Sequence, residues 1–106
     1  MYSLIYYIPP QDHERVKQAL FEQGAGKIGS YDQSCWEISG MGQFRPLSGS
    51  HPAIGQQHQL QRLEEVRVEM VCSEQVIKAV LRTLLKVHPY EQPAYQINRI
   101  LSLQDL

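Results

Sequence analysis

The sequence predicts an α+β fold in which strands and helices follow one another in the ferredoxin-like order βαββαβ. Three observations lead to this prediction. A β-branched and aromatic run opens the chain at residues 2–8, apolar and charged residues alternate within 60–71, and two further segments carry apolar residues at helical spacing. A chain of 106 residues is close to the commonest domain size, so a single domain over residues 1–106 is expected.

The first predicted strand and helix lie within residues 2–24. The even-numbered residues of 2–8 share one face of the strand, because side chains alternate, and Pro9–Pro10 end it. Asp12 is expected to cap the helix that follows, and Gly24 to close it in the left-handed conformation. His13, in the first turn of that helix, is expected to lie on the surface.

The second predicted strand covers residues 34–39, with Trp36 and Ile38 on one face and Cys35 and Glu37 on the other. Residues 40–59 are rich in glycine, proline and polar side chains and predict a long loop or irregular hairpin, of the kind that is functional or disordered.

The third strand, 60–71, places Val66, Val68 and Met70 toward the core, and a charge ladder of Glu65, Arg67 and Glu69 on the opposite face. Ser73 is expected to cap a second helix that Pro89 ends, and residues 94–100 predict the last strand. Two cysteines, Cys35 and Cys72, are too few for a disulfide scaffold and are expected to be buried free thiols.

In this architecture both helices pack on one face of an antiparallel four-stranded sheet, so the other face meets solvent or a partner. This outer face is expected to carry Ser3, Ile5, Tyr7, Cys35, Glu37, Glu65, Arg67, Glu69 and Val71. That mixture is too apolar for a sheet surface fully in water. It predicts a subunit interface whose candidate residues are Ile5, Tyr7, Arg67 and Glu69.

The net charge near zero and the absence of a long apolar run exclude several classes of protein. Ten basic and eleven acidic residues give a net charge of -1, which provides no cationic field for general nucleic-acid binding. The longest apolar run is far shorter than a membrane span, and the first residues lack the features of a signal peptide. A cytoplasmic protein without nucleic-acid or membrane partners is therefore expected.

Two motifs carry candidate ligand-binding residues. Residues 24–29 match G-x-G-x-x-G but follow a helix, so they predict a turn, with anion binding at Lys27 as the alternative. His88-Pro89-Tyr90-Glu91 predicts either a helix stop with Tyr90 in the core or a ligand or metal site that uses His88 and Glu91. A position at a helix C-terminus favours the charged form of His88. The candidate ligand-binding residues are Lys27, Arg45, His88, Tyr90 and Glu91.

Metal ligands and catalytic residues are less strongly indicated. His51 and His58 of the long loop, together with Cys35, form a candidate transition-metal site, with solvated loop histidines as the alternative. No H-E-x-x-H, G-x-S-x-G or C-x-x-C motif is present, so no catalytic residue is assigned. No cofactor is certain, and a divalent metal is the candidate.

Several segments together resemble the inserted domain of the NGG-interacting-factor-three family. They are residues 25–32 (AGKIGSYD), 40–46 (GMGQFRP), 52–55 (PAIG), 65–69 (EVRVE) and 88–95 (HPYEQPAY). The His-Pro-Tyr-Glu-x-Pro segment is also similar to CutA, a trimeric divalent-cation-tolerance protein with a fold like that of PII signalling proteins. The resemblance implies a CutA/PII-like fold and a homo-oligomer, a trimer before a dimer.

The resemblance also separates this chain from the family's chemistry. Full-length relatives, known as type 2 GTP cyclohydrolase I-like, carry two flanking halves that hold a two-metal site, and nothing in this sequence matches those halves. The first hypothesis is therefore a stand-alone, non-enzymatic oligomeric binding or regulatory module. The alternatives are a metal-binding protein or small metal-dependent enzyme with an inter-subunit site, and an interaction subunit for separately encoded partner halves. Whether the chain is an enzyme stays open, with a non-enzymatic role favoured.

Overall fold

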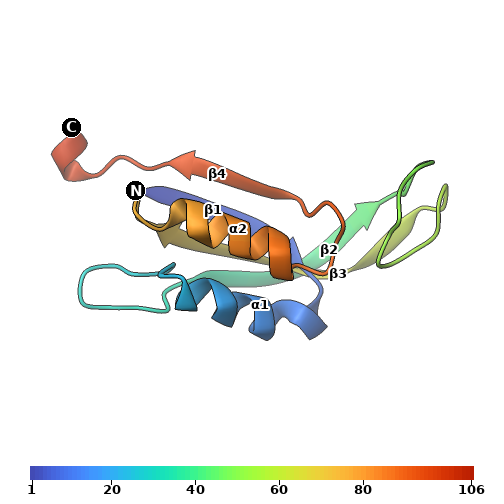
Figure 1. Cartoon of the computed structure of the whole chain (residues 1–106), viewed down its shortest axis with the longest axis horizontal. Coiled ribbons are helices and arrows are strands. Elements are labelled where there is room, and N and C mark those ends of the chain that lie inside the picture. The colour runs from blue at the N-terminus through green and yellow to red at the C-terminus, as the bar shows by residue number, and fades with distance from the viewer.

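The computed structural model describes residues 1–106 as one antiparallel sheet covered by two helices. The sheet order is β2-β3-β1-β4, and Figure 1 shows α1 and α2 on the same face of it. In chain order the elements are β1 (Tyr2–Ile8), α1 (Pro10–Glu22), β2 (Trp36–Phe44), β3 (Gln61–Cys72), α2 (Ile77–Val87), β4 (Tyr95–Arg99) and a 3-10 turn (Leu103–Asp105). The predicted ferredoxin-like βαββαβ order is therefore confirmed.

The core lies between the sheet and the two helices, where the alternation in β1 and β3 predicts it. β1 and β3 pair so that Tyr6 stands opposite Val68, and both side chains are fully buried. The helices contribute apolar residues at helical spacing. The buried cluster consists of Leu4, Tyr6, Ile8, Val16, Leu20, Ala25, Val66, Val68, Met70, Cys72, Val80 and Leu84.

The strand β2 differs from the prediction in both its length and its orientation. Glu37 pairs with Val68, so it faces the helices, while Trp36 and Ile38 lie on the outer face with 66% and 57% of their surface exposed. The expectation that Cys35 and Glu37 lie on the outer face is wrong. Alternation identifies which residues share a face, but the large apolar pair on β2 points away from the core.

The long loop is also shorter than the sequence suggests. Residues 40–44, expected to belong to the loop, continue β2 and pair with β3 as far as Phe44 opposite Gln61. The sequence did not indicate a strand here because residues 40–44 contain two glycines, and glycine is uncommon inside strands. The loop therefore covers residues 45–60 rather than 40–59. It sits at the tip of the β2–β3 hairpin, which extends past the helices and gives the molecule a length of 48 Å against widths of 26 and 23 Å (Figure 1).

At the N-termini of both helices, the structure differs from the side-chain caps expected from the sequence. Helix α1 begins at Pro10 after Pro9, and Asp12 lies inside its first turn, where it pairs with Arg15 at 3.0 Å. Helix α2 begins at Ile77. The backbone N–H groups of Val76 and Ile77 donate to the carbonyl oxygen of Ser73 and not to its hydroxyl. Neither predicted side-chain cap forms. No helix of the chain has the length and apolar character needed to cross a membrane.

The glycine motif at residues 24–29 forms a turn, as its position after a helix predicts. All three glycines, Gly24, Gly26 and Gly29, have positive φ angles, of 101°, 80° and 57°. Glycine adopts this left-handed conformation without steric cost, whereas other residues are strained by it. The buried Cys72 agrees with expectation, but Cys35 is exposed, because it lies in the turn region before β2 starts.

Candidate functional site

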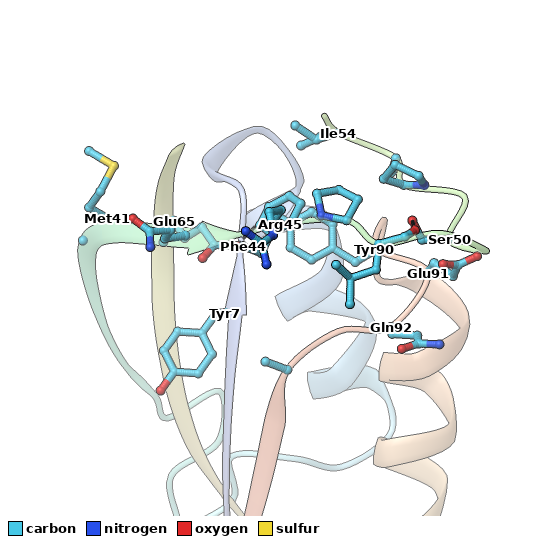
Figure 2. A pocket seen from close by; sticks show the side chains of 18 of the residues that line it. Tyr7, Met41, Phe44, Arg45, Ser50, Ile54, Glu65, Tyr90, Glu91 and Gln92 are labelled. Carbon is cyan, nitrogen blue, oxygen red and sulfur yellow. Dashed lines mark hydrogen bonds between the residues drawn. The ribbon is translucent and has the colours of Figure 1, made fainter. Parts of the chain in front are cut away.

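A cavity of about 970 Å³ lies on the outer face of the sheet, where the β2–β3 hairpin extends past the end of β1. Three parts of the chain form it: the outer face of the strands, the loop 45–60, and the segment that links α2 to β4. Figure 2 shows Phe44, Arg45 and Tyr90 gathered at its centre. The lining residues used below are Tyr7, Ile38, Phe44, Arg45, Glu65, Arg67, Tyr90 and Glu91.

Tyr90 is held in place by three neighbours. Its hydroxyl donates a hydrogen bond to Glu65 Oε2 at 2.8 Å, and its ring centroid lies 5.9 Å from that of Phe44 and 4.9 Å from that of His88. Burial, followed by the Glu65 carboxylate, raises the pKa of the Tyr90 phenol, so the hydroxyl stays protonated and donates. Tyr90 therefore forms a fixed, half-buried wall of the cavity.

His88 supports Tyr90 from behind and is not itself part of the cavity wall. Its Nε2 lies 2.7 Å from the carbonyl oxygen of Tyr7, so Nε2 carries the proton, and Nδ1 accepts the Tyr90 N–H at 3.0 Å. Both ring nitrogens are satisfied only in the neutral imidazole. Burial lowers the pKa of His88. The expected preference for the charged form is therefore wrong, because burial and this hydrogen-bond pattern outweigh the helix C-terminus.

This arrangement predicts that the protein loses stability in mild acid through His88. The pKa of His88 in the folded state is below the ordinary value of 6.5. As the pH falls below 6.5, His88 therefore binds a proton in the unfolded chain before it does so in the folded chain, which favours unfolding. The His88 contribution is complete above the unfolded pKa and decreases toward the folded pKa. Thermal melts between pH about 7.5 and about 5 should show a fall in Tm. The fall should be smaller in His88→Gln, and equal slopes in both proteins would contradict the assignment.

The loop 45–60 is tied to the segment that follows α2. Glu91 Oε1 accepts the backbone N–H of His51 at 3.2 Å. Inside the loop, His58 Nε2 lies 2.9 Å from Ser48 Oγ, and Gln57 donates to the Ser50 carbonyl oxygen at 2.8 Å. Glu91 is exposed and closes the rim of the cavity without supporting the core.

The structure gathers some of the candidate residues and separates others. Arg45, Tyr90 and Glu91 line one cavity, which His88 supports from behind, whereas Lys27 lies in a separate shallow hollow with residues 29–32. The candidate metal ligands His51, His58 and Cys35 do not come together within one chain. Cys35 precedes the first residue of the nine-residue β2, while the loop with the two histidines follows its last. Of the predicted charge ladder, the Arg67–Glu69 pair forms at 2.8 Å, whereas Glu65 accepts the Tyr90 hydroxyl instead.

Sequence reasoning missed three residues of functional interest. Glu65 and Phe44 fix Tyr90, and the signal that could have found them is the pairing of β2 with β3 beyond residue 39. His13 was expected on the surface but is only 6% exposed and pairs with Glu37. The contact between His13 and Glu37 depends on which face of β2 points toward the helices, and the alternation of residues in the sequence does not decide this.

Curated proteins of several bacteria are similar to this chain. The chain is 43% identical over 95 residues to a GTP cyclohydrolase 1 type 2 homolog of Bacillus subtilis, covering 90% of this chain and 26% of that protein. It is 41% identical over 93 residues to the protein of that name from Mycobacterium tuberculosis, covering 88% and 24%. The chain thus spans about a quarter of the length of these relatives. No protein-family model matches it.

Solved structures agree with this relationship. A Bacillus cereus protein related to NIF3 superposes with a TM-score of 0.77 and 32% identity, covering 91% of this chain and 24% of that one. CutA from Xylella fastidiosa has a TM-score of 0.69 at 14% identity, covering 98% and 88%, and a Bacillus subtilis GlnK–ATP complex has 0.61 at 16%, covering 94% and 82%. The chain is a homologue of a segment that makes up about a quarter of the GTP cyclohydrolase 1 type 2 homologs of the NGG-interacting-factor-three family, and it has the CutA/PII-like fold.

Proposed function

We propose that this chain is a non-enzymatic binding or regulatory module that works as a homo-oligomer, with its ligand in the outer-face cavity beside a subunit contact. The observation that carries the proposal is the position of Trp36 and Ile38. Both are largely exposed on the outer face of β2, and Ile38 also lines the cavity. A subunit that covers these side chains would border the cavity as well.

The position of β2 in the sheet supports self-association. It is an edge strand of nine residues, so one row of its backbone N–H and C=O groups has no partner strand. Natural proteins usually cover or disrupt long apolar edge strands, because such strands pair with other chains. Of the candidate interface residues, Tyr7, Arg67 and Glu69 are half-buried on the same outer face, and Ile5 is already 7% exposed within one subunit. We expect a trimer before a dimer.

The charges of the cavity indicate the kind of ligand. Arg45 and Arg67 contribute two positive charges to the lining, and Glu65 and Glu91 contribute two negative charges. A balanced lining of this kind does not suit a polyanion, whereas the rings of Phe44 and Tyr90 offer a stacking surface for an aromatic or apolar group. We therefore propose a small ligand with an apolar or aromatic part and little net charge.

The chain matches only about a quarter of each relative, and this favours docking on a partner protein as a second candidate function. About three quarters of each relative lies outside the matched segment. In this second candidate function, the outer face of the chain would instead dock on partner halves, as an interaction subunit. A metal-dependent role with a site between subunits at His51 and His58 is a further alternative. The name GTP cyclohydrolase 1 type 2 homolog belongs to the whole relatives, and we propose that this chain alone does not turn over GTP.

A pair of substitutions on β2 tests the proposed subunit contact. Ile38→Asp places a charge on the outer face and should shift the protein from oligomer to monomer in sedimentation velocity at micromolar concentration, because burying an unpaired carboxylate at an interface is unfavourable. Met41→Asp is the matched control. Met41 is 64% exposed on the same strand, but its side chain points to the opposite face of the sheet. Dissociation by both variants, or by neither, would contradict the proposed contact.

A further inference from the structure

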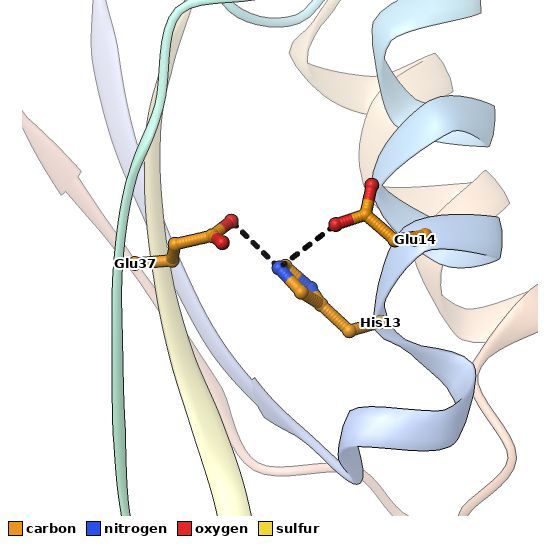
Figure 3. A group of neighbouring side chains, drawn as sticks. All are labelled: His13, Glu14 and Glu37. Atoms are coloured by element: carbon orange, nitrogen blue, oxygen red, sulfur yellow. Dashed lines mark hydrogen bonds and ion pairs between the residues drawn. The ribbon is translucent and has the colours of Figure 1, made fainter.

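A second cluster of chemically active side chains lies between α1 and β2, on the opposite face of the sheet from the cavity. His13 Nε2 is 2.6 Å from Glu37 Oε2 and 3.9 Å from Glu14 Oε1. Figure 3 shows the imidazole of His13 between the two carboxylates, one from its own helix and one from the strand. The three ligand atoms lie within 4.8 Å of one another.

A buried hydroxyl beside this cluster has no hydrogen-bond partner. Tyr6 is fully buried, and its hydroxyl oxygen is unpaired. Tyr6 and Glu37 flank Val68 on neighbouring strands of the sheet, on the face that packs against α1. Buried polar atoms are nearly always hydrogen-bonded, so an unpaired hydroxyl here indicates a group that completes the site.

We propose that His13, Glu14 and Glu37 bind a divalent transition metal, with zinc as the preferred ion, and that a water on the metal's fourth position bonds to the Tyr6 hydroxyl. One imidazole nitrogen and two carboxylate oxygens are a ligand set typical of zinc. Ligand atoms about 2.0–2.2 Å from a tetrahedral zinc lie about 3.3–3.6 Å apart. The observed separations of 2.6 and 3.9 Å lie on either side of this range, so small side-chain shifts reach the geometry.

Lys17 would compete with the metal for the carboxylates of Glu14 and Glu37. Its Nζ lies 3.0 Å from Glu14 Oε1 and 3.2 Å from Glu37 Oε2, so its ammonium neutralises the same carboxylates. Glu37 Oε2 is thus shared between the imidazole of His13 and the ammonium of Lys17. A dication would replace the ammonium, which stands on a long side chain that is 15% exposed.

The site differs from the metal site that the sequence suggests. It uses neither His51 nor His58, and of the earlier candidates only Cys35 is near it in the chain, two residues before Glu37. It is also independent of the proposed ligand cavity, which none of its residues line.

Isothermal titration of untagged, full-length chain with zinc chloride tests the proposal. We expect one zinc per chain. Glu14→Gln and Glu37→Gln should each weaken binding by about tenfold or more, since loss of a direct ligand costs at least as much as loss of an outer-shell partner. Lys17→Gln should tighten binding, because it removes the competing charge. Glu14 is 76% exposed, so its substitution leaves folding intact, and thermal melts without metal verify this for each variant.

The double variant His51→Ala/His58→Ala is the control and should bind zinc like the unmodified chain. Three results would each overturn the proposal: no zinc binding at micromolar concentration, binding that is lost in the loop variant and kept in Glu14→Gln and Glu37→Gln, or Lys17→Gln binding no more tightly than the unmodified chain. The first result would show that the cluster is an ion-pair network only.

Discussion

Replacing Tyr90 with alanine is expected to lower the free energy of unfolding by about 2–3 kcal/mol, near the lower end for truncating a buried aromatic side chain. The side chain is half-buried, packs against the rings of Phe44 and His88, and donates to Glu65. Tyr90→Phe should lose only the hydrogen bond, about 1 kcal/mol. Urea unfolding of the three proteins at neutral pH measures both differences.

Glu91→Ala is the matched control for Tyr90→Ala, because it alters the next residue of the same segment. Glu91 is exposed and bonds only the backbone N–H of His51, so its loss should change stability by no more than about 0.5 kcal/mol. If Glu91→Ala unfolds as readily as Tyr90→Ala, the segment is a structural clamp throughout. The assignment of Glu91 to the rim of a binding cavity would then be wrong.

Gly26→Ala is expected to destabilise the fold by about 3 kcal/mol. A left-handed conformation costs a non-glycine residue about 1–2 kcal/mol, and a clash with packed groups adds about 1–3 kcal/mol. Gly26 has a φ of 80°, and a Cβ there would lie 2.8 Å from the backbone oxygen of Ser34. Gly26 also bonds Ser34 and Val71 through its backbone, which fixes the turn before Cys35.

Gly29→Ala separates the two causes of this effect. Gly29 has a φ of 57°, but nothing lies within 4 Å of the Cβ it would gain. Its substitution should therefore cost only the conformational term, about 1–2 kcal/mol. Equal losses of stability at Gly26 and Gly29 in chemical unfolding would show that close packing against Ser34 does not contribute.

The sequence predicts most of the fold because each strand of the core alternates with a strict period. The buried residues of β1 and β3 follow that period, and Gly24 ends α1 as predicted. The orientation of β2 was not predictable in the same way. Its core-facing side carries Glu37, whose partner His13 lies 24 positions away in the chain, so the decisive interaction is a long-range contact that no local pattern contains.

The candidate site was predictable in part for a similar reason. The segment from His88 to Glu91 stands out because it concentrates chemically distinct side chains at a helix end, and the structure places Arg45 in the same cavity as Tyr90 and Glu91. The roles within it depend on the tertiary structure. The neutral state of His88 follows from the carbonyl oxygen of Tyr7, which lies 81 positions away along the chain.

We propose that the exposed apolar face of β2 joins copies of this chain and thereby completes the ligand cavity. Light scattering on the unmodified chain after size-exclusion chromatography tests it most directly, because the protomer mass of 12.2 kDa makes small assemblies easy to distinguish. We expect a homogeneous oligomer at micromolar concentration, with three times the protomer mass as the first expectation. A monomer at that concentration would contradict it.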